Sequence, residues 1–208
     1  MRAHRARAAR PRGRLVAALA KGGEEDVAEC PDFRLARRIG ERGDAVVADY
    51  TLAAEPGYRF VWAAHALLDL SPAARIDVVG PAVTRLYPDE GDRWLAGNWP
   101  SVDGVPLERL GPDDGSAVGA VVLTSRVSVH DGADTLHLSV EADGQPVAVA
   151  LWRNLGGFPQ GAPYRSIGVE PMLGRVFDRA AADDGDTAVV PPAGGVTWRL
   201  TVTATRRT

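Results

Sequence analysis

The sequence predicts an all-β protein built as an antiparallel β-sandwich, and three observations carry this prediction. From Asp44 onward, short runs rich in Val, Leu, Ile and aromatic residues alternate with Gly, Pro and Asp-Gly sequences, which is the spacing of an all-β domain. The segment 135–141 alternates apolar and polar residues, as a strand with one buried face does. The chain has 208 residues, 45% of them apolar and 25% charged, so it can bury a core.

Residues 1–43 differ in composition from the rest and are predicted to be a basic leader and a short linker, followed by one domain at 44–208. They contain eleven Lys and Arg against six Asp and Glu, a net charge of +5, whereas the remainder contains thirteen against twenty-one, a net charge of −8. The first 14 residues hold six arginines and no acidic residue, which favours a solvated, disordered tail over a nucleic-acid arm or a transit sequence. Around Cys30, the weak apolar pattern fits a short helix or a loop.

Strands are predicted wherever an apolar or β-branched run lies between turn residues. The pairs Asp131-Gly132 and Asp143-Gly144 are expected to form hairpin turns, because Asp before Gly suits the positive φ values that such turns need. The stretch 88–116 is rich in Gly, Pro and Asp and is expected to be a long ordered loop held by Trp94 and Trp99. In chain order, the predicted strands are 45–53, 58–70, 75–79, 83–87, 118–129, 135–141, 147–153, 166–171 and 196–203.

Composition also argues against several classes of protein. The single cysteine, Cys30, cannot form an internal disulfide or a Cys-based zinc site, and no apolar run reaches the length of about 18 residues that a membrane helix needs. We therefore expect a soluble, cytoplasmic protein that does not bind membranes. The acidic domain disfavours nucleic acid as a partner. His130 and His137 flank one turn but lack a third ligand, and the aspartates of the loops, such as Asp186, fit solvated turns rather than a calcium site, so no metal is expected.

His65 is the histidine with the most informative surroundings. It is the only ionisable residue in the apolar segment 60–68, and the alternation of a strand would place it on one face with the small Ala63. Two interpretations remain open. The imidazole faces a ligand, for which the neighbouring alanines leave room, or it is a buried histidine satisfied by a backbone carbonyl.

Glu170 is the second candidate for chemistry. It is a carboxylate at the end of the apolar segment 166–171, where burial without a partner would be costly. Pro171 favours an extended conformation at Glu170 and is expected to end the strand there, at the rim of a sheet. Arg165, Arg175 or backbone amides could hold the carboxylate for purely structural reasons.

Two of these segments resemble a known family. FVWAAHALLDL resembles the F-x-W-x-x-H-P-[YL] segment of the aldose 1-epimerase (galactose mutarotase-like) family, and GVEPMLG resembles its late E-P segment with the catalytic glutamate. The resemblance covers about residues 45–205. Ala66 stands where the family has proline, and the first half of the family's domain has no visible counterpart. The resemblance implies a galactose mutarotase-like supersandwich, here incomplete, whose concave face binds a sugar.

The activity implied by this resemblance is that of an isomerase that interconverts sugar anomers by acid/base ring opening. Glu170 would be the base at O1 and His65 the acid at the ring oxygen, with no metal or organic cofactor. We expect the two groups at opposite edges of one sugar-sized hollow. Trp152 and Gln160 are the expected substrate-binding residues, although burial in the core is the competing interpretation for Trp152.

Two other functions are compatible with the same residues. The first is a non-catalytic carbohydrate-binding β-sandwich derived from the same fold. The second is a glycosidase, which would need a second carboxylate to work with Glu170, such as Glu55 or Glu141.

Overall fold

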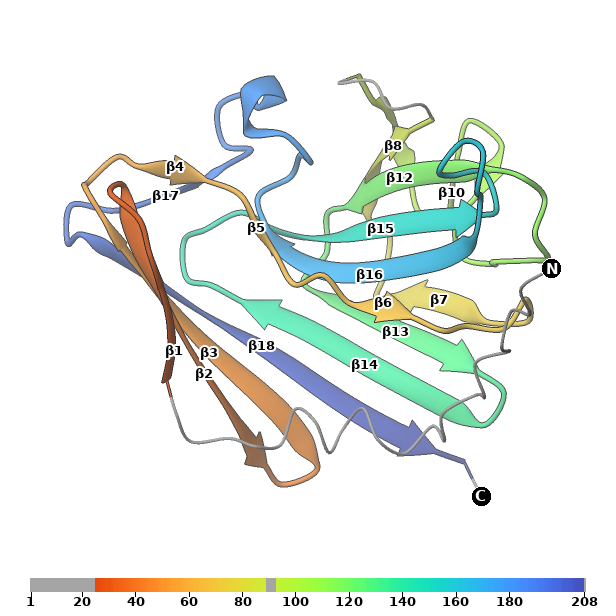
Figure 1. Cartoon of the computed structure of the whole chain (residues 1–208), viewed down its shortest axis with the longest axis horizontal. Coiled ribbons are helices and arrows are strands. Elements are labelled where there is room, and N and C mark those ends of the chain that lie inside the picture. The colour runs from red at the N-terminus through yellow and green to blue at the C-terminus, as the bar shows by residue number, and fades with distance from the viewer. Residues whose placement is uncertain (1–24, 89–92, 208) are drawn as a thin grey trace, which may run out of the picture.

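The computed structural model describes residues 25–88 and 93–207, and it confirms the predicted antiparallel β-sandwich (Figure 1). One sheet has seven strands and the other has nine, and the regular helical structure in these residues is one short 3₁₀ turn at Arg179–Ala181. In spatial order, the seven-stranded sheet contains β1 (Glu25–Glu29), β2 (Phe33–Arg42), β3 (Ala45–Ala54), β18 (Gly195–Arg206), β14 (Asp134–Glu141), β13 (Arg126–Asp131) and β7 (Arg75–Val78).

The nine-stranded sheet lies over the seven-stranded one and ends in an interrupted edge. Its last full strand, β16, pairs with two short strands in succession. A separate pair is formed by β17 (Ala188–Val189) and β4 (Arg59–Phe60). In order, the sheet contains β11 (Val105–Pro106), β10 (Ser101–Val102), β9 (Leu95–Asn98), β8 (Val83–Tyr87), β12 (Ala117–Val122), β15 (Val147–Leu155), β16 (Arg165–Leu173) and β5 (Trp62–Ala63), with β6 (Leu67–Leu68) also on β16.

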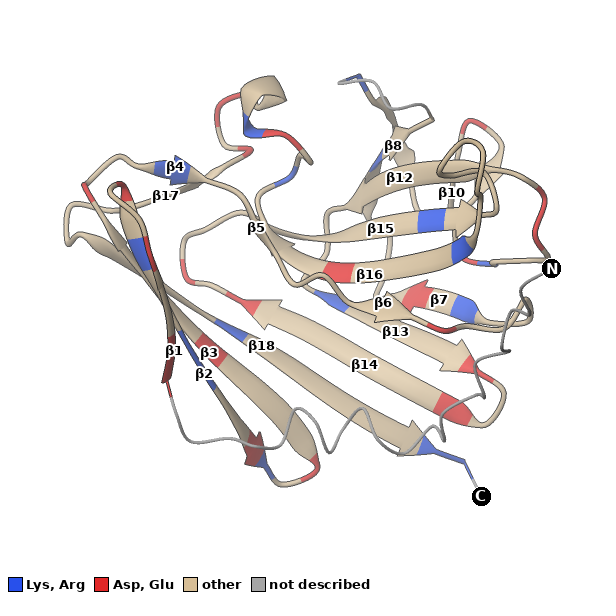
Figure 2. Ribbon diagram, in the orientation of Figure 1, with Lys and Arg blue, Asp and Glu red and all other residues tan. Residues whose placement is uncertain are grey.

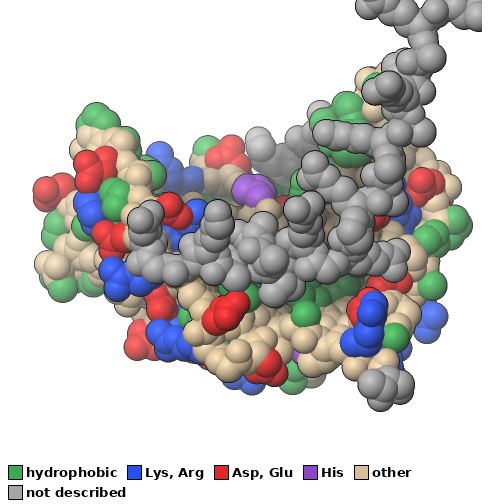
Figure 3. Space-filling model, turned by 60° about the horizontal axis from the view of Figure 1, so that its bottom comes forward, with side chains coloured by type: hydrophobic (Ala, Val, Ile, Leu, Met, Phe, Trp, Pro, Cys, Tyr) green, Lys and Arg blue, Asp and Glu red, His purple; other side chains and the backbone are tan. Residues whose placement is uncertain are grey.

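Charged side chains of both signs are spread over the outside of the sandwich. Figure 2 shows blue and red positions scattered over strands and loops, with β16 carrying one acidic residue within its length. The face seen in Figure 3 likewise mixes acidic and basic side chains without a large area of one sign. Pairs such as Arg37 with Asp26 and Arg199 with Asp49 join neighbouring strands, and exposed pairs of this kind contribute little to stability.

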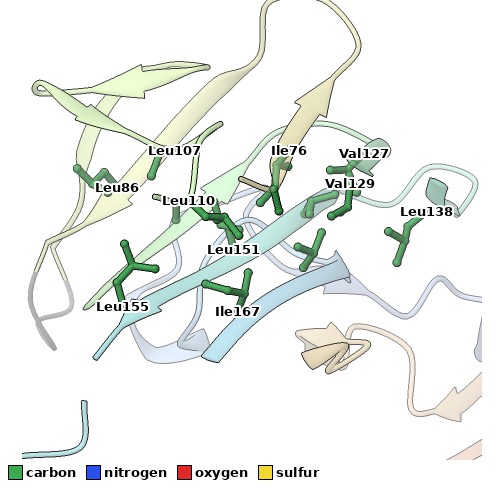
Figure 4. Close-up of a cluster of buried hydrophobic side chains, with 14 of the residues drawn as sticks. Ile76, Leu86, Leu107, Leu110, Val127, Val129, Leu138, Leu151, Leu155 and Ile167 are labelled. Atoms are coloured by element: carbon green, nitrogen blue, oxygen red, sulfur yellow. The ribbon is translucent and has the colours of Figure 1, made fainter. Parts of the chain in front are cut away.

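The main core lies between the two sheets (Figure 4). Leu86, Ala120, Leu151 and Val169 are successive register partners across β8, β12, β15 and β16, and each is at most 2% exposed. Their side chains pack with apolar residues of the seven-stranded sheet, which include Ile76, Val127, Val129 and Leu138. Because side chains alternate along a strand, the neighbours of these residues in β8, β12, β15 and β16 point to the opposite, outer face of the nine-stranded sheet.

The N-terminal part of the described chain differs from the prediction. Of the two alternatives around Cys30, the short helix is wrong and the loop is confined to residues 30–32. On either side of it β1 and β2 form a hairpin, and β2 pairs with β3 over ten positions. Apolar residues recur here with a period of two, at Phe33, Leu35 and Ile39, and pack into a second core cluster. The sheet therefore begins before residue 44, where the domain was predicted to start. The basic leader at 1–24 lies outside the described residues.

Two connections also differ from the prediction. The expected strand at 118–129 is two strands in different sheets, β12 and β13, since the Thr124 hydroxyl bonds both the carbonyl and the N–H of Arg126 and turns the chain. Asp131-Gly132 does join a hairpin, between β13 and β14, with Gly132 at φ +61°. Asp143-Gly144 instead connects β14 to β15 in the other sheet, so it is not a hairpin turn.

The stretch 88–116 contains the short strands β9, β10 and β11, and both tryptophans that were expected to hold it pack against core clusters. Residues 89–92 of this stretch lie outside the described part. Within the described ranges, no helix has the length and apolar character to cross a membrane.

Candidate active site

The strand register brings His65 and Glu170 together. β5 and β6 both pair with β16 in one continuous register, and His65 lies in the gap between them, directly opposite Glu170. Backbone hydrogen bonds of 3.0 Å on both sides of this pair keep the chains at the distance of a β-ladder. His65 Nδ1 lies 3.0 Å from Glu170 Oε2. Two groups 105 positions apart in the sequence thus become cross-strand neighbours.

His65 lies neither within a strand nor in the core, so both sequence-based expectations for it differ from the structure. The predicted strand at 58–70 is broken into β4, β5 and β6, with His65 outside all three. Its side chain is 81% exposed, so the interpretation as a buried histidine satisfied by a carbonyl is wrong. The imidazole also touches the carboxylate directly, whereas the sequence placed the two at opposite edges of a hollow.

Glu170 lies in the middle of β16 rather than at its end. Pro171 does not stop the strand, because it pairs with Val149 and β16 continues to Leu173. The Pro171 carbonyl accepts a hydrogen bond from Ala64, so its nitrogen faces the irregular edge between β5 and β6, where a missing N–H costs no ladder bond to β15. The expectation that Glu170 marks a sheet rim at a strand end is therefore wrong.

Burial sets the electrostatics of Glu170. The residue is 7% exposed, and burial raises the pKa of its carboxyl above the ordinary value, an effect that the charge and hydrogen bond of His65 partly offset. Among the described residues, the His65 contact is its one ion pair. Arg165, a predicted structural partner, instead bonds Asp113 and two backbone carbonyls.

Trp152 lies next to Glu170 on the outer face of the nine-stranded sheet. Gly168 is its register partner on β16, and residues 168 and 170 share a face because they are two positions apart. The indole is half-buried and belongs to none of the core clusters, unlike Trp198. Its Nε1 donates to Ser166 Oγ at 3.1 Å, which fixes the ring orientation.

A loop at 156–164 borders this indole. The Phe158 ring meets Trp152 edge-on, with 5.8 Å between centroids, and is 39% exposed. Asn154, which is fully buried, holds the loop by donating to the Phe158 and Tyr164 carbonyls and accepting from two backbone amides. Gln160 is exposed on the same loop, and no hydrogen bond within the described residues joins it to Glu170 or His65.

A buried ion pair at the other side of the same face was missed by the sequence analysis. Arg85 Nη1 and Nη2 donate to both carboxylate oxygens of Asp186 at 2.8 and 2.9 Å, and the guanidinium lies 4.5 Å from the Trp94 ring centroid. Asp186 is 3% exposed, so its prediction as a solvated turn residue is wrong. The two residues are 101 positions apart, and no local pattern could reveal the pairing.

An apolar groove of about 860 Å³ borders the other side of the His65 segment. It lies between residues 62–68 and the inner face of the seven-stranded sheet, where Leu35, Ile39, Leu200 and Val202 line it. His65 is on its border, and Glu170 is not part of its lining. The edge segment that carries the imidazole therefore separates this groove from the carboxylate.

The other two histidines of the described residues, His130 and His137, have side-chain partners of their own. His130 Nδ1 bonds the Thr135 hydroxyl and its Nε2 lies 3.1 Å from Asp77, while His137 Nδ1 bonds the Ser128 hydroxyl. In residues 25–88 and 93–207, no group of three or more His, Cys, Asp and Glu side chains could hold a metal ion.

The comparisons with known proteins identify the fold. No protein-family model and no curated protein matches the sequence. Among solved structures, a candidate aldose 1-epimerase from Escherichia coli K12 matches with a TM-score of 0.63 and 14% identity, over 89% of this chain and 69% of that one. Two further structures match. A galactose mutarotase-like protein from Lactobacillus casei has a TM-score of 0.58 and 13% identity, over 87% of this chain and 68% of that one. A galactose mutarotase related enzyme from Lactobacillus acidophilus has a TM-score of 0.53 and 12% identity, over 89% of this chain and 72% of that one.

Proposed function

We propose, on the premise that this chain has the galactose mutarotase-like fold, that it binds an aldose and interconverts its anomers by acid/base ring opening. In this proposal Glu170 is the base and His65 the acid. The observation that carries it is the contact of 3.0 Å between a buried carboxylate and an exposed imidazole on one face of the sheet. The chain spans about two thirds of the length of the matched proteins, so the activity is a proposal for this chain itself.

The two groups have the properties that the reaction needs. Ring opening removes the proton from the anomeric hydroxyl and adds one to the ring oxygen as the C1–O5 bond breaks. Ring closure on the other face of the carbonyl returns both protons. Burial gives Glu170 a raised pKa and hence a stronger conjugate base than an exposed glutamate. The exposed His65 can carry the second proton to and from the ring oxygen.

The neighbouring aromatic residues would bind the sugar ring. Trp152 lies on the same face as Glu170, and Phe158 packs edge-on against it. Aromatic side chains of this kind suit the C–H side of a pyranose. Gln160, exposed on the loop that carries Phe158, would supply a polar group for a hydroxyl. The substrate must also separate the imidazole from the carboxylate, since the two touch directly.

A non-catalytic carbohydrate-binding protein is the second candidate. The same His65–Glu170 contact is compatible with it, because a carboxylate that stays paired is not a free base, while Trp152 and Phe158 could still bind a sugar. A glycosidase has less support. Glu141 lies on β14 of the other sheet and Glu55 is exposed just after β3, so neither belongs to the sheet that carries Glu170.

Polarimetry tests the proposal. Purified protein is expected to accelerate mutarotation of freshly dissolved α-D-glucose or α-D-galactose, and Glu170→Gln is expected to lower kcat by about 100- to 10,000-fold, as the loss of one positioned proton transfer does. The matched control is Glu141→Gln, which changes an exposed carboxylate of the other sheet and should retain the wild-type rate. Sugar binding detected by Trp fluorescence without any acceleration of mutarotation would replace the first candidate by the second.

A further inference from the structure

The carboxylate of Glu170 occupies the space that a side chain at position 168 would fill. A Cβ atom added to Gly168 would lie 2.7 Å from Glu170 Oε1 and 3.3 Å from Glu170 Cδ. The same atom would lie 3.2 Å from Trp152 Cβ. Residues 168 and 170 project from the same face of β16, so the carboxylate is folded back along its own strand instead of pointing straight out of the sheet.

No backbone requirement explains a glycine at this position. Gly168 lies inside β16, pairs in register with Trp152, and is not among the residues with positive φ. A glycine within a strand weakens the strand and often marks a close approach by another group. Here the approaching group is the carboxylate, which is the nearest neighbour of the absent side chain.

The two carboxylate oxygens consequently have different surroundings. Oε2 contacts His65 Nδ1 at 3.0 Å. Oε1 lies over Gly168, and within the described residues it accepts no hydrogen bond. The indole N–H of Trp152 donates to Ser166 Oγ. Oε1 is thus the oxygen left for a ligand.

We propose that Gly168 is a positioning residue for the proposed reaction, because the absence of a side chain there lets the Glu170 carboxylate lie flat on the sheet between His65 and Trp152. This inference rests on the proposed function for its kinetic consequence, whereas its geometric content does not depend on activity. A methyl group at 168 would displace the carboxylate outward and move Oε1 away from the substrate position.

The test compares Gly168→Ala with Gly40→Ala. Gly40 lies inside β2, and a Cβ added there meets no atom within 4 Å, so it controls for the loss of a strand glycine. Gly168→Ala is expected to lower kcat by at least 10-fold with a smaller change in KM, while Gly40→Ala stays within 2-fold of wild type. A Gly168→Ala variant with wild-type kcat would overturn the proposal.

A second readout separates this inference from the proposed function. The ionisation of Glu170 can be followed by the ¹³C shift of its side-chain carboxyl in labelled full-length protein, whether or not the protein is active. Burial is the largest cause of the raised pKa, so a displaced carboxylate should titrate closer to an ordinary glutamate in Gly168→Ala and unchanged in Gly40→Ala. Wild-type titration in Gly168→Ala would overturn the positioning role, whereas inactivity of the wild-type protein would overturn only the proposed function.

A double variant covers the case in which Gly168→Ala folds poorly. Glu170→Asp shortens the side chain and withdraws the carboxylate from the space above residue 168. Adding Gly168→Ala to Glu170→Asp should therefore change the urea midpoint less than adding it to wild type. An equal loss in both backgrounds would assign the crowding to Trp152 and overturn the proposal.

Discussion

Burial of Glu170 destabilises the folded protein when the carboxyl is charged, and it also makes the carboxylate more basic. A carboxylate that is 7% exposed and has one exposed histidine as its ion partner is stabilised less when charged than a carboxylate in water, which is why its pKa is raised. The buried carboxylate of Glu170 is therefore a stronger base than the carboxylate of an exposed glutamate. The family resemblance named Glu170 and His65 as a pair, and only the strand register showed that the two side chains are in direct contact.

Replacing Glu170 is expected to change stability with a specific dependence on pH. The raised pKa means that the folded state loses stability as pH rises through that pKa and the buried carboxyl ionises. Glu170→Gln lacks this loss, so the Tm of the variant minus the Tm of wild type should increase from pH 4 to pH 8. In a protein of this size, each kcal/mol of unfolding free energy corresponds to about 2–4 °C in Tm. Thermal unfolding followed by circular dichroism measures it. A Tm difference that is constant over this range would contradict the linkage.

At the scale of elements, β15 and β16 organise the site. Their antiparallel register sets Trp152 beside Gly168 and Ala150 beside Glu170, and β15 continues into the loop that carries Phe158. Asn154, near the end of β15, binds backbone groups of that loop on both its amide nitrogen and its oxygen. One buried amide therefore links the strand to the border of the site.

Asn154→Ala is expected to lower the free energy of unfolding by about 2–4 kcal/mol, because it removes a fully buried amide that bonds four backbone groups of the loop. Urea unfolding measures this loss. Asn98→Ala is the matched control, since Asn98 is exposed at the end of β9, and it should change the value by no more than about 0.5 kcal/mol. Equal midpoints for the two variants would show that the loop does not depend on Asn154.

For the whole molecule, the two sheets share one main core. Apolar side chains from β8, β12, β15 and β16 meet those from β7, β13 and β14 between the layers. Since neither sheet can bury its inner face alone, we expect the sandwich to unfold as one unit.

Leu151→Ala probes this shared core. Leu151 is 2% exposed at the centre of β15, and its truncation is expected to cost about 2–5 kcal/mol. Far-UV circular dichroism and Trp fluorescence should report the same shifted urea midpoint. The control Leu95→Ala removes a leucine that is 41% exposed and should have a small effect. Separate transitions for the two probes would contradict a single cooperative unit.

The sequence by itself determined the local features of this protein. Apolar and β-branched runs between turn residues predicted most of the central strands, including 75–79 and 83–87. Alternation supported 135–141, because a strand with one buried face imposes a period of two on its own residues. The two family-like segments identified the fold that the structure confirmed, and His65 and Glu170 as candidates. Strand patterns and short family-like segments are both local, because each depends only on residues that are close together in the chain.

Only the tertiary structure decided which distant residues meet. Three features depend on partners far away in the sequence. They are the division of the apolar run 118–129 between two sheets, the position of His65 in a gap of the edge strand, and the Arg85–Asp186 pair. The role of Gly168 also depends on another residue, since the space that a side chain would fill there is occupied by the Glu170 carboxylate. Register and packing between strands are set by the whole core, and no segment contains that information alone.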